Sequence, residues 1–203
     1  PMKKYICGVV ILMVCSFNIC NAAEFFVSPK GKDESGKGSI DAPYKTILHV
    51  LDHVAEPGDI ITLRAGTYNE EVRIRKPSIT IRSMEGERAV ISMPTDLDEL
   101  FMPVIFDVES KGSVIQNLEI IGGFYGIFFF SEWDWDDTPL DNDAAKNIII
   151  EDCIIHDTGR DCIKLPAGCD NITIRRCEIY NSGMGYPQGT PDDDKNAEGI
   201  DVV

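Results

Sequence analysis

A strand–bend–strand pattern recurs in the second half of this chain. It occupies residues 113–120 (SVIQNLEI), 148–155 (IIIEDCII) and 172–179 (ITIRRCEI). In each copy, β-branched residues flank one polar residue at the expected bend, which is Asn117, Asp152 or Arg176. Alternating apolar residues indicate strands, and repetition at this scale indicates stacked coils, because each coil buries its apolar side only against the next. The pattern therefore predicts an all-β solenoid.

A third strand follows each copy and completes the predicted coil. These strands lie at residues 125–129, 161–165 and 198–202. Successive side chains of a strand point to opposite faces, so the isoleucine of each strand is expected to point inward. The next residue then points outward, and these residues are Phe128, Lys164 and Asp201. Stacking of the coils predicts a column of these three side chains on the outer face.

The same stacking predicts an interior ladder of Leu118, Cys153 and Cys177. We interpret the two cysteines as buried free thiols, because free cysteine is among the most buried residue types. Adjacent strands are close enough for a disulfide, which is the alternative. Pairing of Cys162 with Cys169 is left open.

The amino-terminal part of the mature chain has a different pattern. A short strand is expected at residues 25–27 and another at 60–63. Between them, apolar residues at helical spacing predict a helix after Pro43. Its apolar face comprises Ile47, Leu48, Val50, Leu51 and Val54. Such a helix can cover the open end of the first coil, which would otherwise expose its apolar interior and strand edges.

The runs FFVSPKGKDESGKG, APYKTILHVL and EPGDIITLRAGTY resemble the amino-terminal segment of secreted right-handed parallel β-helix proteins. This pectate-lyase-like group includes polysaccharide lyases and glycoside hydrolases. The resemblance implies a right-handed parallel β-helix with an N-terminal capping helix, and a polysaccharide as substrate or ligand. A fold alone does not fix a reaction, so the site residues must be considered separately.

The first residues resemble a secretory signal peptide. Two lysines precede an apolar run at residues 6–14, and small residues precede Glu24. We therefore expect a signal peptide at residues 1–23 and one β-helix domain at 24–203. The product would be secreted, periplasmic or on the cell surface, monomeric, and without a membrane anchor after cleavage. The chain stops at Val203 inside an expected strand, so we expect the domain to continue.

The formal net charge of −15 excludes some partners. A chain this acidic is a poor ligand for nucleic acid or for anionic membranes. It also repels an acidic polysaccharide unless a cation or local basic residues intervene. Such a ligand would therefore require residues near the predicted column that bind a cation or supply positive charge.

Two long polar segments flank the predicted column, at residues 131–146 and 182–197. They leave from opposite ends of strands in one sheet, so they could wall a groove with Phe128, Lys164 and Asp201 on its floor. The alternative is a solvated face on which Lys164 and Asp201 form an ion pair that contributes little to the stability of the fold.

The second segment predicts a calcium site. Calcium prefers several carboxylate oxygens, and this region contains Asp192, Asp193, Asp194, Glu198 and Asp201. The run Glu198–Asp201 is similar to an acidic motif of calcium-dependent pectate lyases, although glutamate replaces the usual aspartate. An exposed acidic loop is the alternative.

The same region contains the candidate substrate-binding and catalytic residues. Trp133 and Trp135 in the first segment are suited to stacking on sugar rings, together with Phe128; the alternative is packing of the indoles on the solenoid. Lyases of this fold often use lysine or arginine as base, which makes Lys164 and Arg160 the catalytic candidates. A structural role is the alternative for each.

Two other functions stay open. Asp161 and Glu198 occupy matching positions on successive coils and could serve as the carboxylate pair of a polygalacturonase-like hydrolase. Their order along the chain is reversed relative to that group, and Arg160 replaces an expected aspartate. A non-catalytic glycan-binding or surface-adhesion solenoid is the second class. We expect a calcium-assisted lyase that cleaves an acidic polysaccharide by β-elimination.

Overall fold

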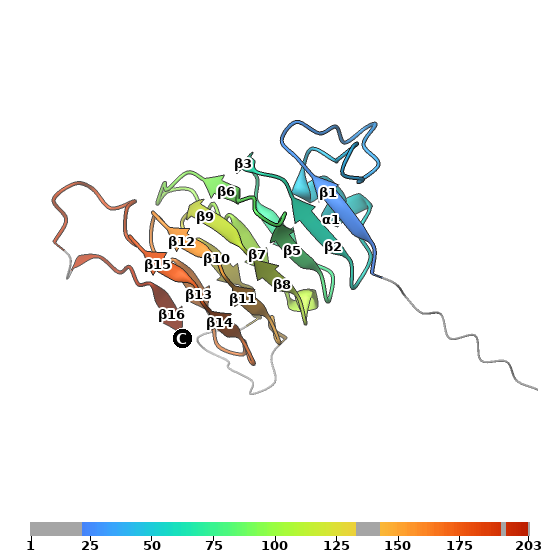
Figure 1. Cartoon of the computed structure of the whole chain (residues 1–203). Coiled ribbons are helices and arrows are strands. Elements are labelled where there is room, and N and C mark those ends of the chain that lie inside the picture. Colours follow the sequence, from blue (N-terminus) through green and yellow to red (C-terminus); the bar gives the residue numbers. More distant parts are fainter. Residues whose placement is uncertain (1–21, 133–142, 192–193, 203) are drawn as a thin grey trace, which may run out of the picture.

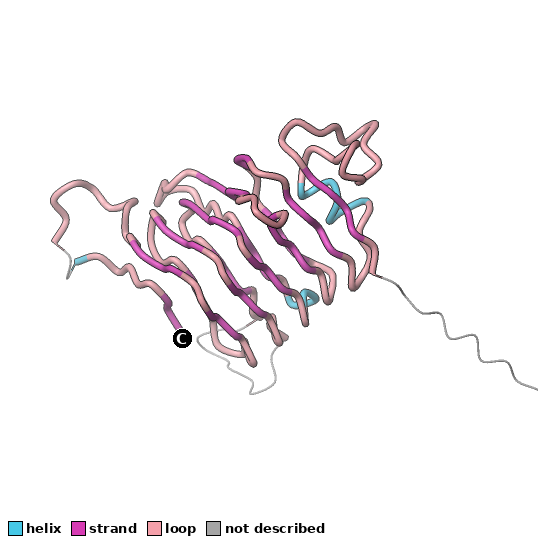
Figure 2. Tube along the Cα trace, in the orientation of Figure 1, coloured by secondary structure: helices cyan, strands magenta, loops and turns pink. Residues whose placement is uncertain are grey.

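The computed structural model describes residues 22–132, 143–191 and 194–202. The expected signal peptide therefore lies almost entirely outside the described residues. Within them the chain winds as a parallel β-helix in which each coil after β1 contributes one strand to each of three parallel sheets (Figures 1 and 2). The predicted all-β solenoid is confirmed.

The first sheet has the order β1-β2-β5-β8-β11-β14, comprising β1 (Glu24–Val27), β2 (Ile60–Leu63), β5 (Thr80–Ser83), β8 (Val114–Gln116), β11 (Ile149–Glu151) and β14 (Thr173–Arg175). The second sheet comprises β3 (Gly66–Tyr68), β6 (Ala89–Met93), β9 (Leu118–Gly122), β12 (Ile154–His156) and β15 (Glu178–Tyr180). The third comprises β4 (Val72–Ile74), β7 (Val104–Phe106), β10 (Ile127–Phe129), β13 (Ile163–Leu165) and β16 (Ile200–Val202). A short 3₁₀ turn, η1 (Val108–Ser110), follows β7.

The corners between the first and second sheets fall where the sequence predicts bends. Asn117, Asp152 and Arg176 have φ values of 54°, 55° and 54°. This left-handed backbone region is unfavourable for most residues and favours asparagine and aspartate. At Arg176 the side chain is held in place, because its Nε donates to Asp152 Oδ1 at 2.7 Å. One left-handed residue thus turns the chain from the first sheet to the second.

Two other corner positions form polar ladders between coils. Asn171 Nδ2 donates to Asn147 Oδ1 at 2.6 Å, and Asn181 Nδ2 donates to Asp157 Oδ1 at 2.9 Å. All four residues have positive φ. The side chains of the corners therefore bond to the equivalent corner of the next coil, which fixes the register of the stack.

The predicted interior ladder is confirmed. β9 pairs with β12 through Glu119 and Ile154, and β12 with β15 through Ile154 and Glu178. The residues that precede these, Leu118, Cys153 and Cys177, are therefore in register. Leu118 and Cys153 are buried and Cys177 is half-buried. Both cysteines, and Cys162 and Cys169, have free thiols.

The capping helix is confirmed as α1 (Ile47–His53). Ile47, Val50 and Leu51 are buried in the core. Leu48 is exposed, so its assignment to the apolar face is wrong. Its position is rotated about 100° from that of Ile47, which is enough to leave the narrow stripe that faces the coil. No helix in the described part of the chain is long and apolar enough to cross a bilayer.

Candidate functional site

A column of side chains runs across the outer face of the third sheet. The strand pairings align Arg73 of β4 with Ile105 of β7, then with Phe128, Lys164 and Asp201 of β10, β13 and β16. The predicted order of Phe128, Lys164 and Asp201 is confirmed. We call these five residues the third-sheet column.

The first two members of the column were not predicted. Their strands are VRI at residues 72–74 and VIF at 104–106, which are as short as the later strands of this sheet. They also lack the preceding strand–bend–strand pattern that marks the later coils. The signal that could have found them is the apolar–any–apolar alternation shared with the strands at 127–129 and 163–165.

The column is hollowed around Phe128. A cavity of about 270 Å³ lies there, and its lining residues are Glu71, Arg73, Leu100, Met102, Ile105, Phe128 and Phe130. The ring of Phe128 also stacks on Tyr125, with centroids 5.7 Å apart and an interplanar angle of 10°. This end of the column therefore offers apolar and aromatic surface.

The other end of the column is ionic. Lys164 Nζ and Asp201 Oδ2 form a close ion pair. Their side chains are only 15% and 17% exposed, so the pair is largely shielded from water. The ion pair belongs to the alternative that the sequence left open, but that alternative placed it on a solvated face, whereas here both side chains are shielded. The pair lies beside Phe128, since Lys164 is in register with it.

Arg160 is held beside the ionic end. Its Nε donates to the carbonyl of Asn196 at 2.8 Å, and its Nη1 donates to the Tyr125 hydroxyl at 3.3 Å. The guanidinium carbon also lies 5.8 Å from the centre of the Tyr125 ring. Arg160 therefore connects the aromatic surface to the segment at 182–197.

Asp161 follows this arginine in the chain. Its side chain is fully buried, and its Oδ1 accepts a hydrogen bond from the Glu198 amide at 2.9 Å. Its Oδ2 has no hydrogen-bond partner among the described residues and lies 3.6 Å from Arg160 Nε. Burial raises the pKa of this carboxyl, the Glu198 amide and Arg160 oppose the shift, and Asp201 adds to it.

Two segments border the amino-terminal ends of the third-sheet strands. The segment at 182–197 is tied to Arg160 through Gly183 and Asn196. A second segment, at residues 94–103, was not predicted as a wall. Gly185 lies so close to the carbonyl of Thr95 and to Leu97 that a Cβ would meet both within 3 Å. The two segments therefore pack on each other.

The remaining predicted site residues fall into two groups. Trp133, Trp135, Asp192 and Asp193 lie outside the described residues. Asp194, Glu198 and Asp201 are described, but the described residues contain no group of three or more carboxylate, imidazole or thiol side chains that could hold a metal ion. Asp201 is instead engaged by Lys164.

The expected carboxylate pair has the predicted register. Ile163 pairs with Ile200, which places Asp161 opposite Glu198. Glu198 is exposed, whereas Asp161 is buried. The structure therefore aligns the two residues but leaves only one of them accessible to a sugar.

The chain is similar to known proteins at two levels. A family model described as a right handed beta helix region matches residues 104–201. No functionally curated protein matches the chain.

Among solved structures, pectate lyase Pel9A is 15% identical with a TM-score of 0.63, over 81% of this chain and 41% of that chain. An alginate lyase from Paenibacillus sp. str. FPU-7 is 21% identical with a TM-score of 0.54, over 76% of this chain and 54% of that chain. A GH136 lacto-N-biosidase from Eubacterium ramulus is 14% identical with a TM-score of 0.56, over 89% of this chain and 40% of that chain. The chain thus spans about half the length of these structures, and the likeness shows a right-handed parallel β-helix.

Proposed function

On the premise that this chain is a right-handed parallel β-helix of the beta helix region family over residues 104–201, we propose that it binds an acidic polysaccharide along the third-sheet column and cleaves it by β-elimination. The observation that carries the proposal is the alignment of Phe128 with Lys164 on neighbouring coils, with Arg160 beside them. An aromatic surface next to two cations suits an anionic sugar chain. Solved β-helix structures named as pectate, alginate and rhamnogalacturonan lyases support the same class.

The two cations have different roles in this proposal. A guanidinium stays protonated in proteins, so Arg160 neutralises the uronic carboxylate with its planar fork. Lys164 first passes a proton to Asp201, which ends the ion pair, and its neutral amine then takes the proton from carbon 5 of the sugar. The bond between carbon 4 and the glycosidic oxygen then breaks and a double bond forms between carbons 4 and 5. The leaving oxygen takes up the proton held by Asp201, directly or through water, which restores the ion pair with the Lys164 ammonium.

The proposal includes a calcium ion, which would bind at the acidic segment 182–197. The described carboxylates alone do not fit a closed calcium site, because Asp201 is paired with Lys164 and no three ligands come together. A site here would need Asp194 and Glu198 together with Asp192 and Asp193, which lie outside the described residues. Titration calorimetry with calcium chloride on the whole chain tests this, and absence of heat at millimolar calcium would remove the ion from the proposal.

The reaction is tested with a panel of polyuronates. A lyase gives unsaturated products that absorb in the ultraviolet, and we expect this absorbance to be lost in Lys164→Ala. Lys111→Ala is the matched control, because Lys111 is exposed and distant in the sequence from the column. Equal activity of wild type and Lys164→Ala on every polyuronate that is cleaved would refute the assigned role.

The Lys164–Asp201 pair also favours a second candidate, a glycan-binding solenoid without catalysis, because the only lysine of the column is already engaged. The same panel separates the functions. Retardation in a polysaccharide gel without any product indicates binding alone. New reducing ends without ultraviolet absorbance would indicate the hydrolase, for which the buried Asp161 would have to become accessible.

A further inference from the structure

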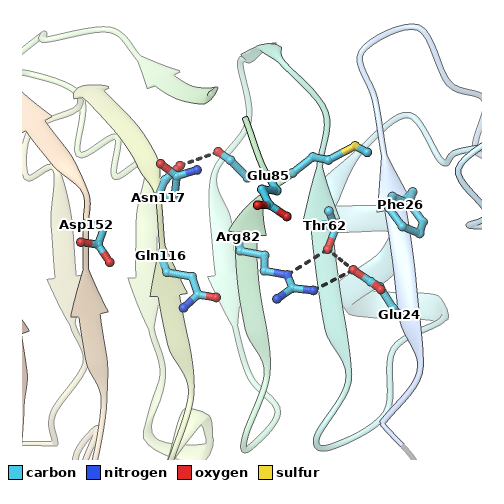
Figure 3. A pocket seen from close by; sticks show the side chains of 10 residues that line it. Glu24, Phe26, Thr62, Arg82, Glu85, Gln116, Asn117 and Asp152 are labelled. Carbon is cyan, nitrogen blue, oxygen red and sulfur yellow. Dashed lines mark hydrogen bonds and ion pairs between the residues drawn. The ribbon is translucent and has the colours of Figure 1, made fainter. Parts of the chain in front are cut away.

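A second hollow lies on the outer face of the first sheet, away from the third-sheet column. Its volume is about 450 Å³. Figure 3 shows it from close by, and its lining residues are Glu24, Phe26, Thr62, Arg82, Ser83, Met84, Glu85, Gln116, Asn117 and Asp152. None of these residues belongs to the site proposed above, so this hollow requires its own explanation.

Four adjacent strands form the floor of the hollow. The pairings align Phe26 of β1 with Thr62 of β2, Arg82 of β5 and Gln116 of β8. Three steps between strands at about 4.8 Å each give a floor about 14 Å long. The floor is therefore elongated along the solenoid axis and has an aromatic ring at one end and an amide at the other.

Donor groups of Arg82, Gln116 and Asn117 are bound within the protein. Arg82 Nε donates to Thr62 Oγ1 at 3.3 Å, and Nη2 donates to Glu24 Oε1 at 3.0 Å (Figure 3). Gln116 Nε2 donates to a glutamate of the next strand at 2.9 Å. Asn117 Nδ2 donates to a backbone carbonyl at 3.3 Å. These bonds hold the side chains in fixed positions before any ligand arrives.

The acceptors remain available to a ligand. Within the described part of the chain, no donor is bound to Gln116 Oε1, to Asn117 Oδ1 or to the Glu85 carboxylate. A molecule that fits here must therefore bring hydrogen-bond donors. Sugar hydroxyls are such donors, and their apolar ring faces match the side chain of Phe26. Polyanions are disfavoured, because Glu24 and Glu85 both line the hollow.

We propose that this hollow on the first sheet binds a neutral oligosaccharide, separately from the acidic chain at the third-sheet column. The two faces would then select sugars of different charge. The proposal goes beyond the proposed function and does not depend on it, since it concerns other residues and another ligand.

The test is titration calorimetry of the whole chain with hexasaccharides of xylose, glucose and galactose, and with hexagalacturonate. We expect at least one neutral hexasaccharide to bind. Glu85→Lys, which places a long cation at the mouth of the hollow, should weaken that binding by about fivefold or more. Phe26→Leu keeps apolar volume but removes the ring face, and should weaken it by a similar factor.

Glu178→Lys is the matched control. It makes the same charge change at an exposed position of β15 in the second sheet, outside the hollow, and should leave neutral binding unchanged. Thermal melting of each variant verifies folding. The proposal is overturned if no neutral hexasaccharide binds at up to about 10 mM, or if folded Glu85→Lys and Phe26→Leu both bind as wild type does. Loss of hexagalacturonate binding in Lys164→Ala reports on the third-sheet column alone.

Discussion

Replacement of Asp161 by asparagine should stabilise the protein at neutral pH. The Asp161 carboxyl is fully buried, and its Oδ2 has no hydrogen-bond partner among the described residues. An unsatisfied buried polar atom costs roughly 1–3 kcal/mol, and more when charged. Arg160 at 3.6 Å offsets part of this cost. An asparagine keeps the acceptor for the Glu198 amide and removes the buried charge, although its Nδ2 gains no acceptor and the attraction to Arg160 is lost. We therefore expect a net gain of at most about 1 kcal/mol.

The gain should depend on pH in a defined direction. Burial raises the pKa of Asp161 above its usual value. Between the unfolded and folded pKa values the folded state binds more protons, so the stability of the wild type falls as pH rises through that window. The advantage of Asp161→Asn should therefore be smallest near pH 4 and complete at neutral pH.

Thermal melting by circular dichroism measures this gain. For a domain of this size, 1 kcal/mol corresponds to about 2–4 °C in Tm. Asp161→Ala is the informative comparison, because it also leaves the Glu198 amide without its acceptor and should be less stable than Asp161→Asn. Asp98→Asn, at an exposed position, should change nothing. A lower Tm of Asp161→Asn than of wild type at neutral pH would refute the reasoning.

Three further predictions concern the corners, the cap and the interior. Asn181→Ala should lower stability by about 1 kcal/mol through loss of its bond to Asp157 and of a residue suited to positive φ, whereas Asn181→Gly should recover the backbone part; denaturant unfolding of both variants measures the difference. Glu70→Ala should cost about 1–2 kcal/mol, because Glu70 accepts from the Ile47 and Leu48 amides at the start of α1, and an unchanged unfolding midpoint would contradict this. Cys153→Ser should destabilise the fold more than Cys153→Val, since the site is apolar and buried, and equal midpoints would count against the ladder as an apolar element.

Much of the fold was predictable because each coil of a solenoid repeats the same sequence pattern of strands and corners. Asn117 and Asp152 are polar residues between β-branched runs, and such residues tolerate the left-handed backbone that a corner needs. Alternation then placed Phe128 and Lys164 outward, and stacking placed them in register. These inferences use only neighbours in sequence and one repeat length.

Features that depend on side-chain contacts between distant residues were not predictable. The ion pair of Lys164 with Asp201 was one of two alternatives, and only the conformation of both side chains selects it. The hollow on the first sheet is lined by both Phe26 and Gln116, which lie 90 residues apart in the sequence. Gln116 belongs to the strand–bend–strand pattern and Phe26 does not, so the pattern could not align the two residues. The packing of residues 94–103 on Gly185 has no periodic signal in the sequence.

The single-residue corners have a consequence for how such a protein can change. A coil that turns on one left-handed residue has no spare backbone there, so an insertion at Asp152 would displace the strand that follows and its bonds to Arg176. Longer segments occur instead at 28–46, 94–103, 131–146 and 182–197, and the last three adjoin strands of the third sheet. We therefore expect the chain to tolerate changes in length within these segments, mostly along the margin of the third sheet, while the scaffold beneath keeps its dimensions.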